Sequence, residues 1–188
     1  MSGLFGVYSK KPSSNVAEQA YLALFALQHR GQESCGIAVC DHGVISNQRD
    51  LGLVPDVFTD ETLKKLGTGN MAVGHVHYAV NGQHKSRSNA QPLAVRHIKG
   101  PMAIALAGSI TNAASLREGL EHTGAIFHTR TDAEVLSYVI TKARLKTDSI
   151  EKAVQAALCE IEGAYSLIVM SPRKIIAARH HFFLYIKV

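Results

Sequence analysis

The order of hydrophobic patterns along the chain constrains its fold most. Short apolar runs dominate the first hundred residues, three runs with helical period follow between 112 and 161, and two more apolar runs occupy 165–170 and 174–178. Short runs bounded by turn-forming residues predict strands, whereas apolar residues that recur every three or four positions predict amphipathic helices. The sequence therefore predicts an α+β fold in which helices and sheets form layers.

The individual elements follow from the same patterns. A helix is expected from Asn15, with Ser14 or Asn15 as its N-cap and Gly31 as its terminator. Asp41-His42-Gly43 separates two apolar runs and predicts a hairpin turn. The expected strands are 4–8, 36–40, 44–46, 71–78, 102–106, 165–170 and 174–178, and the later helices are 112–121, 132–142 and 150–161.

Length and composition exclude several classes of protein. The 188 residues, 46% of them hydrophobic, suit a single globular domain over 1–188 that needs no metal or disulfide to stabilise its core. The three cysteines show no CxxC spacing, so neither a disulfide framework nor a zinc site is expected. No apolar run approaches the roughly 18 residues of a membrane span. The net charge of +5 is scattered, so nucleic-acid binding is not expected, and we expect a cytoplasmic protein.

Four polar segments, three of them with a glycine, are attached to predicted strand or helix ends, where loops often carry function: 28–33, 74–78, 106–109 and 129–132. Each also has an ordinary structural explanation. His75 and His77 are spaced so that both rings point to one face of a strand, as in metal-binding pairs, but no third ligand is evident and no metal is expected. Asp132 suits the start of a helix as a capping residue. Gly108 suits a β-bulge, or else a backbone N–H left open for an anion.

The combination of motifs, in order, closely resembles the glutaminase half of amidophosphoribosyltransferases, over nearly the whole chain. The residues that carry the resemblance are Met-Ser-Gly-Leu-Phe-Gly-Val at the start, 26–34 with 36–39, 52–54 with 57–58, 74–78, 89–93, 108–112, 129–136 and 163–166. The resemblance implies a four-layer α/β/β/α sandwich of the N-terminal nucleophile hydrolase type. It implies glutamine as substrate, ammonia as product, purine biosynthesis as context, and no cofactor.

The resemblance also assigns roles to individual residues. Members of the family carry an N-terminal Cys that attacks the glutamine amide while its own α-amino group acts as base, and Ser2 stands at this position. An Asn-Gly pair forms the oxyanion hole, and Ala107 and Gly108 match it, so the side-chain donor is missing. An Arg that binds the substrate α-carboxylate is matched by His77, which lacks the bidentate guanidinium.

Two further positions agree with the family pattern. Asp132 matches the aspartate that binds the substrate α-ammonium, and Arg30 is retained in the turn beside the substrate site. Loss of the Cys nucleophile, the Arg and the oxyanion Asn implies impaired catalysis. The phosphoribosyltransferase domain of the family is expected to be absent from 1–188, so the expected partners are a separate phosphoribosyltransferase or synthase subunit and a second copy of the chain.

Two other functions agree with the same residues. One is a non-catalytic homologue that serves as a binding or regulatory module, or a truncated remnant of a longer enzyme. The other is an amidohydrolase that uses an N-terminal Ser2 on a different amide. Catalysis by Ser2 depends on removal of Met1, because a retained Met1 leaves no free amine on Ser2.

Overall fold

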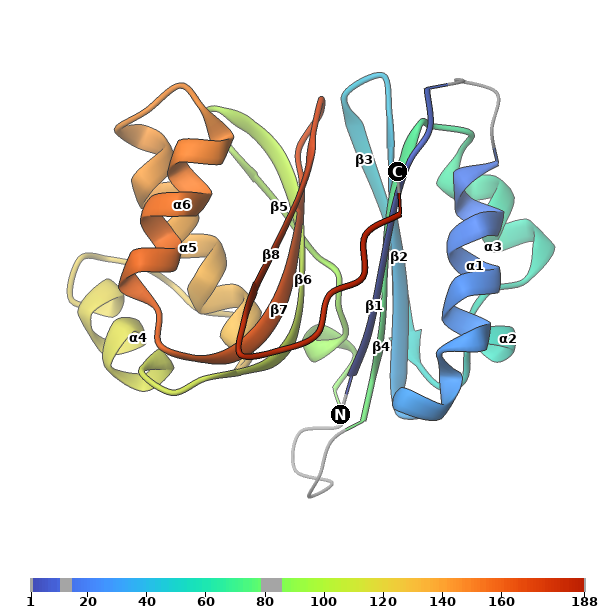
Figure 1. The fold of residues 1–188 in the computed structure, drawn as a ribbon, viewed down its shortest axis with the longest axis horizontal. Coiled ribbons are helices and arrows are strands. Elements are labelled where there is room, and N and C mark those ends of the chain that lie inside the picture. The colour runs from blue at the N-terminus through green and yellow to red at the C-terminus, as the bar shows by residue number, and fades with distance from the viewer. Residues whose placement is uncertain (1, 11–14, 79–85, 188) are drawn as a thin grey trace.

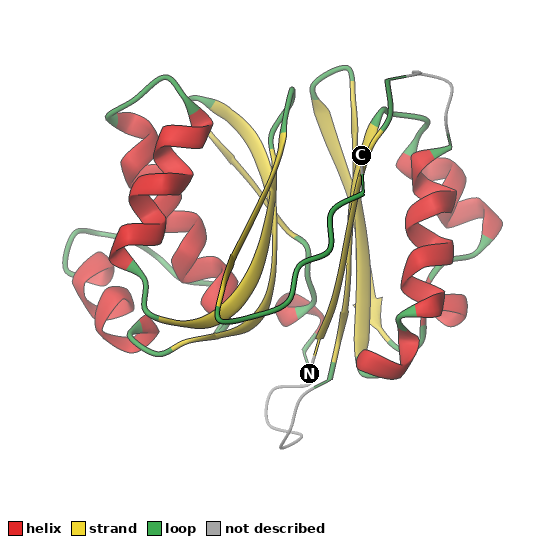
Figure 2. Cartoon of the chain, viewed as in Figure 1, coloured by secondary structure: helices red, strands yellow, loops and turns green. Residues whose placement is uncertain are grey.

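The computed structural model describes residues 2–10, 15–78 and 86–187. Two four-stranded antiparallel sheets pack face to face, and helices cover the outer face of each sheet, as Figures 1 and 2 show. The order of the layers is therefore α/β/β/α, which confirms the fold class expected from the sequence and from the resemblance.

The first sheet consists of β1 (Ser2–Tyr8), β2 (Ser34–Asp41), β3 (Val44–Leu51) and β4 (Met71–His77), in the spatial order β1-β4-β2-β3. The predicted hairpin joins β2 and β3, but β3 continues five residues beyond the predicted Ser46. Only part of β3 is apolar because it is an edge strand and most of its residues are half exposed.

The second sheet consists of β5 (Leu93–His97), β6 (Gly100–Ile110), β7 (Gly163–Met170) and β8 (Ile175–His180), in the order β5-β6-β7-β8. The sequence did not predict β5, an edge strand of five residues that alternates between buried and exposed positions. Each sheet is thus built from its own part of the chain, the first before residue 78 and the second after residue 92.

Three helices cover each sheet within the described residues. Helices α1 (Val16–Ala26), α2 (Val54–Val57) and α3 (Asp60–Leu66) lie on the first sheet, and α4 (Ala113–Glu121), α5 (Asp132–Leu145) and α6 (Ile150–Glu160) lie on the second (Figure 1). The sequence missed α2 and α3, which are short.

The N-terminus of α1 forms as predicted, whereas its C-terminus does not. The Asn15 Oδ1 accepts a hydrogen bond of 3.1 Å from the Glu18 N–H, which makes Asn15 the N-cap, and Ser14 lies outside the described residues. The prediction that Gly31 ends this helix is wrong, because α1 stops at Ala26 and a 3₁₀ turn over Gln28–Arg30 precedes Gly31.

Apolar side chains of mixed size pack between the two sheets. The layer between them contains Ala38, Cys40, Met71 and Val73 from the first sheet and Ala103, Ala105, Ile168 and Met170 from the second. The outer face of each sheet packs against its own helices through larger aliphatic residues. Burial of these three clusters supplies the main driving force for folding.

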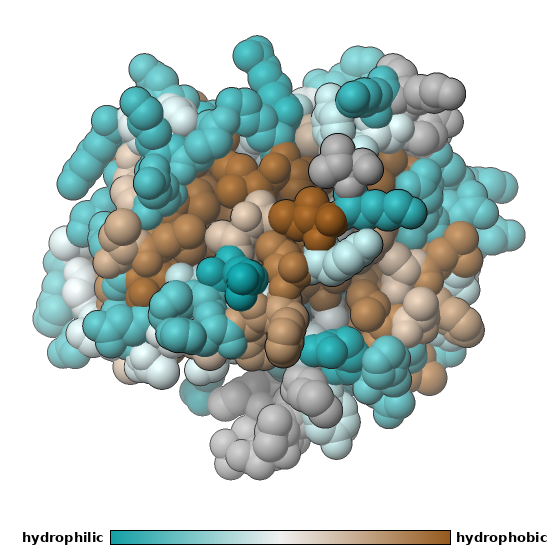
Figure 3. All heavy atoms as spheres, in the orientation of Figure 1, coloured by the Kyte–Doolittle hydropathy of each residue, from teal (hydrophilic) through white to brown (hydrophobic). Residues whose placement is uncertain are grey.

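Exposed apolar residues lie on the face of the molecule that Figure 3 shows. Figure 3 shows apolar residues on the front of the molecule, the region of β8 and the C-terminal segment in Figure 1. Phe183 and Tyr185 of that segment are 98% and 88% exposed. None of the described helices combines the length and the apolar character needed to cross a lipid bilayer.

Candidate functional site

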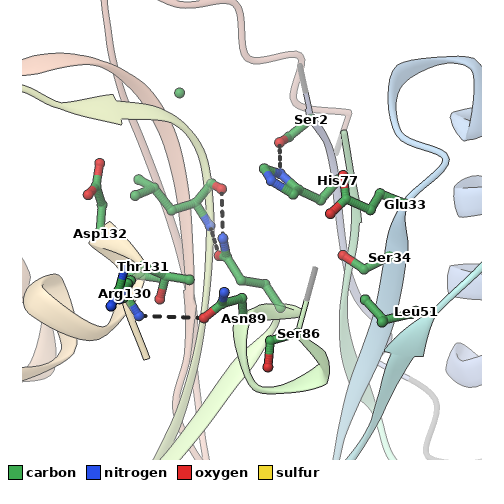
Figure 4. A pocket seen from close by; sticks show the side chains of 14 residues that line it. Ser2, Glu33, Ser34, Leu51, His77, Ser86, Asn89, Arg130, Thr131 and Asp132 are labelled. Atoms are coloured by element: carbon green, nitrogen blue, oxygen red, sulfur yellow. Dashed lines mark hydrogen bonds between the residues drawn. The ribbon is translucent and has the colours of Figure 1, made fainter. Parts of the chain in front are cut away.

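A pocket of about 230 Å³ opens where the ends of β1 and β4 face β6 and the start of α5. Figure 4 shows side chains from both sheets and from α5 turned toward this space. The residues that line it are Ser2, Glu33, Ser34, Leu51, His77, Ser86, Asn89, Gln91, Leu106, Gly108, Arg130, Thr131, Asp132 and Ala133. Four of the six predicted site residues are among them, namely Ser2, His77, Gly108 and Asp132.

Ser2, the first residue of β1, and His77, the last residue of β4, are in direct contact. The two residues are paired in the antiparallel register of these strands, and paired residues present their side chains to the same face. The Ser2 Oγ lies 2.9 Å from the His77 Nδ1 (Figure 4). Arg30 does not line the pocket, and its Nε instead donates a hydrogen bond of 3.1 Å to the Ser2 carbonyl, which fixes the backbone at the nucleophile position.

His75 and His77 lie on one face of β4, as their spacing predicts. Their ring centroids are 5.8 Å apart and the planes differ by 21°. His75 is completely buried between the sheets, with its Nε2 3.2 Å from the Leu106 carbonyl oxygen of the other sheet. The His75 Nδ1 is buried without a hydrogen-bond partner in the structure.

Burial controls the charge of both imidazoles. It lowers the pKa of His75 from 6.5 to about 3, helped by the neighbouring His77. Burial also lowers the pKa of His77, although the nearby Glu33 carboxylate opposes this effect. Both rings are therefore neutral near pH 7, and neither can replace the permanent charge of an arginine.

Gly108 occupies a conformation that other residues rarely adopt. Its φ is +112°, and a Cβ built on it would lie 2.2 Å from the Ala164 carbonyl oxygen on β7. The pairing of β6 with β7 continues through Gly108 opposite Tyr165 without an inserted residue, so the predicted bulge is wrong. The glycine is required because the backbone approaches a neighbouring strand closely at a positive φ.

Ala107 lies beside the pocket rather than in its lining. The residue is only 3% exposed, and it follows Ala103 and Ala105 in the alternation that faces the layer between the sheets. Its methyl group offers no hydrogen-bond donor to a ligand.

Asp132 is the first residue of α5, and its carboxylate is turned toward β6. The Asp132 Oδ2 accepts a hydrogen bond of 2.8 Å from the Ile110 N–H. Burial raises the pKa of this carboxyl, while the Ile110 N–H and the Arg117 charge oppose the rise. The prediction that Asp132 caps the helix is wrong, because Thr131 holds the N-cap position and the Asp132 carboxylate instead accepts a hydrogen bond from β6.

A buried carboxylate holds the loop that leads to Asp132. The two Glu134 carboxylate oxygens accept hydrogen bonds from the His128 N–H at 2.9 Å, from the Thr129 N–H at 2.6 Å and from the Thr129 hydroxyl at 2.7 Å. The Arg130 N–H then donates to the Asn89 Oδ1 at 3.5 Å (Figure 4). These hydrogen bonds hold the loop that carries Arg130. Among the described residues that line the pocket, Arg130 is the one with a permanent positive charge.

Gln91 is a structural support of the site that sequence reasoning missed. Its Oε1 accepts a hydrogen bond of 2.7 Å from the Leu106 N–H, and its Nε2 donates to the Leu106 carbonyl oxygen at 3.4 Å (Figure 4). Gln91 therefore anchors β6 just before Ala107 and Gly108. The only sequence signal for it was its place within the Asn-Ala-Gln-Pro-Leu motif.

The pocket brings together groups that an acyl-transfer reaction can use. It combines a hydroxyl, a neutral imidazole, a glycine backbone and a carboxylate. Across the described ranges, no cluster of three or more His, Cys, Asp or Glu side chains is arranged to hold a metal ion.

Comparisons with known proteins agree with this reading. Residues 75–185 match the family model described as "Glutamine amidotransferase domain". The chain is 43% identical over 179 residues to the amidophosphoribosyltransferase of Methanocaldococcus jannaschii, an alignment that covers 95% of this chain and 37% of that protein.

Two solved structures share the fold. One is described as the allosteric regulatory enzyme of purine biosynthesis, with a TM-score of 0.85 and 33% identity. The other is the glutamine phosphoribosylpyrophosphate amidotransferase of B. subtilis complexed with ADP and GMP, with a TM-score of 0.81 and 32% identity. Each alignment covers 95% of this chain and 37% of the other, so the chain spans little more than a third of these relatives.

Proposed function

Since the chain belongs to the family of glutamine amidotransferase domains, we propose that its pocket binds glutamine and that Ser2 attacks the side-chain amide to release ammonia. The observation that carries this proposal is the convergence of Ser2, His77, Gly108 and Asp132, from four different elements, on one pocket. A nucleophile, a hydrogen-bonding partner, a backbone donor and a substrate-binding carboxylate are the groups that amide hydrolysis requires.

The two ends of glutamine have separate partners in this arrangement. The Asp132 carboxylate binds the α-ammonium, and the Gly108 N–H stabilises the oxyanion that develops on the amide carbonyl. Gly108 lies on β6 between Leu106 and Ile110, whose own N–H groups are bound by Gln91 and Asp132. Arg130 replaces the missing arginine at position 77 as the partner of the α-carboxylate, because it is the permanent cation of the described lining.

The proposed reaction is slow compared with that of a complete family member. A serine hydroxyl is far less ionised than a cysteine thiol near neutral pH. The lack of a side-chain donor at Ala107 costs about 3 kcal/mol of transition-state stabilisation, or about 10²–10³-fold in rate, by analogy with loss of one oxyanion donor.

The direct test is release of ammonia and glutamate from glutamine by purified protein whose N-terminus has been verified by intact mass. We expect slow turnover that disappears in Ser2→Ala and increases in Ser2→Cys. Arg130→Gln should raise KM more than it lowers kcat, because the lost interaction concerns the bound substrate. Equal rates in the wild type and Ser2→Ala would refute the assignment of Ser2 as nucleophile.

We further propose that the ammonia serves a phosphoribosyltransferase partner in purine biosynthesis. The support is the similarity to proteins that are amidophosphoribosyltransferases, of which this chain spans little more than a third. Mixing the chain with a separately produced phosphoribosyltransferase should make product formation depend on glutamine. Formation of product only with free ammonia would argue against this partnership. A homo-oligomeric state and a cytoplasmic location stay predictions.

A second candidate function is a glutamine-binding module without catalysis. It is favoured by the neutral His77 and by the methyl group of Ala107, which together remove two groups that the family uses. Binding of glutamine by calorimetry, with no ammonia release from either the wild type or Ser2→Cys, is the expected result of this function. Strong turnover by Ser2→Cys would exclude this function, because it would show that the pocket supports glutamine hydrolysis once a thiol is present.

A further inference from the structure

The contact between Ser2 and His77 places an imidazole nitrogen within hydrogen-bond distance of the hydroxyl that the proposed function uses as nucleophile. The Ser2 Oγ and the His77 Nδ1 are 2.9 Å apart, within the distance for direct proton transfer. The contact does not depend on flexible loops, because both residues belong to strands and are paired in the β1–β4 register. His77 is also paired with Ser34 on β2, so its backbone is held by strands on both sides.

A serine hydroxyl requires such a partner, because its own acidity is too low for it to attack an amide near neutral pH. We propose that Ser2 and His77 form a nucleophile–base pair that cleaves a primary carboxamide without the free α-amino group on which the family mechanism depends. The substrate class rests on the proposed function, whereas the pair itself rests on the Ser2–His77 geometry. His77 is therefore more than a substitute for a missing arginine, because it supplies a base.

The reaction balances with these two side chains and water. As the Ser2 Oγ bonds to the amide carbon, its proton moves to the His77 Nδ1. His77 then gives that proton to the amide nitrogen, the C–N bond breaks, and ammonia leaves an ester on Ser2. A water molecule transfers one proton to His77 and adds to the ester, and His77 returns the proton to the Ser2 oxygen. The products from glutamine are glutamate and ammonia.

The surroundings of His77 suit a base that works near neutral pH. Burial lowers the pKa of His77 and so keeps the ring unprotonated in the resting state. The Glu33 carboxylate, from the segment before β2, favours the imidazolium that forms when His77 accepts the proton. Glu33 is thus a charge-balancing residue of the pair, and it lines the same pocket.

Other titratable groups around the ring come from β4 itself, from α5 and from the loop before α5. His75 on β4 stacks against His77 and is itself uncharged because its pKa lies at about 3. Across the pocket, Asp132 of α5 and Arg130 of the preceding loop carry opposite charges and line the far wall. The Glu33 carboxylate is the charge that most strongly favours protonated His77.

The test uses an aryl fluorophosphonate, a probe that reacts with activated serine hydroxyls and does not require glutamine binding. Mass spectrometry should find the probe on Ser2 in the wild type, with Met1 status recorded from the intact mass. His77→Asn retains an acceptor near the Nδ1 position but cannot take up a proton. It should slow both labelling and glutamine hydrolysis by about 10²-fold or more. His122→Asn, at the exposed C-cap of α4, is the matched control and should label like the wild type.

The pH profile of wild-type labelling tests the same idea without a substitution. With His77 as base, the rate should rise to a plateau with a midpoint below pH 6.5, because the pKa of His77 is lowered. With the α-amino group as base, the midpoint should lie near pH 8. Glu33→Gln should move the midpoint to lower pH, since the carboxylate that favours the imidazolium is removed.

The outcomes separate this inference from the proposed function. Labelling of Ser2 that depends on His77, without glutamine turnover, would support the nucleophile–base pair and refute glutamine as the substrate. Glutamine turnover that is equal in the wild type and His77→Asn would support the function and refute the pair. Absence of labelling in the wild type, or a midpoint near pH 8, would also overturn the pair.

Discussion

Acid should destabilise the protein through His75, which is buried between the two sheets. Its Nε2 faces the Leu106 carbonyl, its Nδ1 has no hydrogen-bond partner among the described residues, and the adjacent side chain on the same face of β4 is the His77 imidazole. Burial lowers the pKa of His75 from 6.5 to about 3, and among the described residues no carboxylate offsets this effect. The unfolded chain therefore binds a proton at this residue at a pH where the folded chain does not.

The magnitude follows from proton linkage. Because the folded-state pKa is lower than the unfolded one, the stabilisation is fully present above pH 6.5 and is lost as the pH falls from 6.5 toward 3. At about pH 5, the unfolded imidazole is almost fully protonated and the folded one is neutral, which lowers the free energy of unfolding by about 2 kcal/mol relative to about pH 7.5. This is a large fraction of the stability of a typical domain.

Urea unfolding at these two pH values, in the wild type and in His75→Gln, is the appropriate assay. Glutamine places an amide N–H close to the original Nε2 and does not titrate. Any loss of packing in the variant lowers its unfolding free energy equally at both pH values and cancels in the difference between them. We expect the loss of unfolding free energy on acidification to be about 2 kcal/mol smaller in His75→Gln than in the wild type. His77 titrates in both proteins, so comparison of the two isolates His75. Equal losses would refute the reasoning.

Three other substitutions test the backbone, the pocket and a helix cap. Gly108→Ala places a Cβ 2.2 Å from the Ala164 carbonyl oxygen at a φ of +112°, so we expect urea denaturation to show a loss of at least about 2 kcal/mol, and an unchanged midpoint would contradict the close approach. Ala107→Asn restores a side-chain donor and should raise glutamine hydrolysis about 10²-fold in protein that remains folded, whereas an unchanged rate would show that position 107 does not face the oxyanion. Ser149→Ala removes the hydroxyl that accepts a 3.2 Å hydrogen bond from the Lys152 N–H and should cost about 1 kcal/mol by thermal unfolding, which identical melting curves would disprove.

Local patterns predicted the buried strands because those strands are apolar on both faces. Every residue of β2 from Ser34 to Cys40 is buried, and six of the seven residues of β4 are buried, so each appears as a continuous run in the sequence. Edge strands have no such run. Arg96 and His97 in β5 lie on the partly solvated border of the second sheet, and this is why β5 was missed.

The site was predicted in part for a related reason. The side-by-side placement of His75 and His77 follows from the two-residue period of a strand. The hydrogen bond between Ser2 and His77 joins residues 75 positions apart, and it depends on which strands pair and in which register. Neither the pairing nor the support of Leu106 by Gln91 can be obtained from periodicity.

The division of the chain into two consecutive sheets has a consequence for protein synthesis. When residue 92 leaves the ribosome, every strand of the first sheet and all three of its helices have already been made. The inner face of that sheet, with Ala38, Met71 and Val73, is covered only when β6 and β7 follow. Until then the nascent chain exposes an apolar surface of the kind that molecular chaperones bind, and the pocket at Ser2 is incomplete because six of its fourteen lining residues have not yet been made.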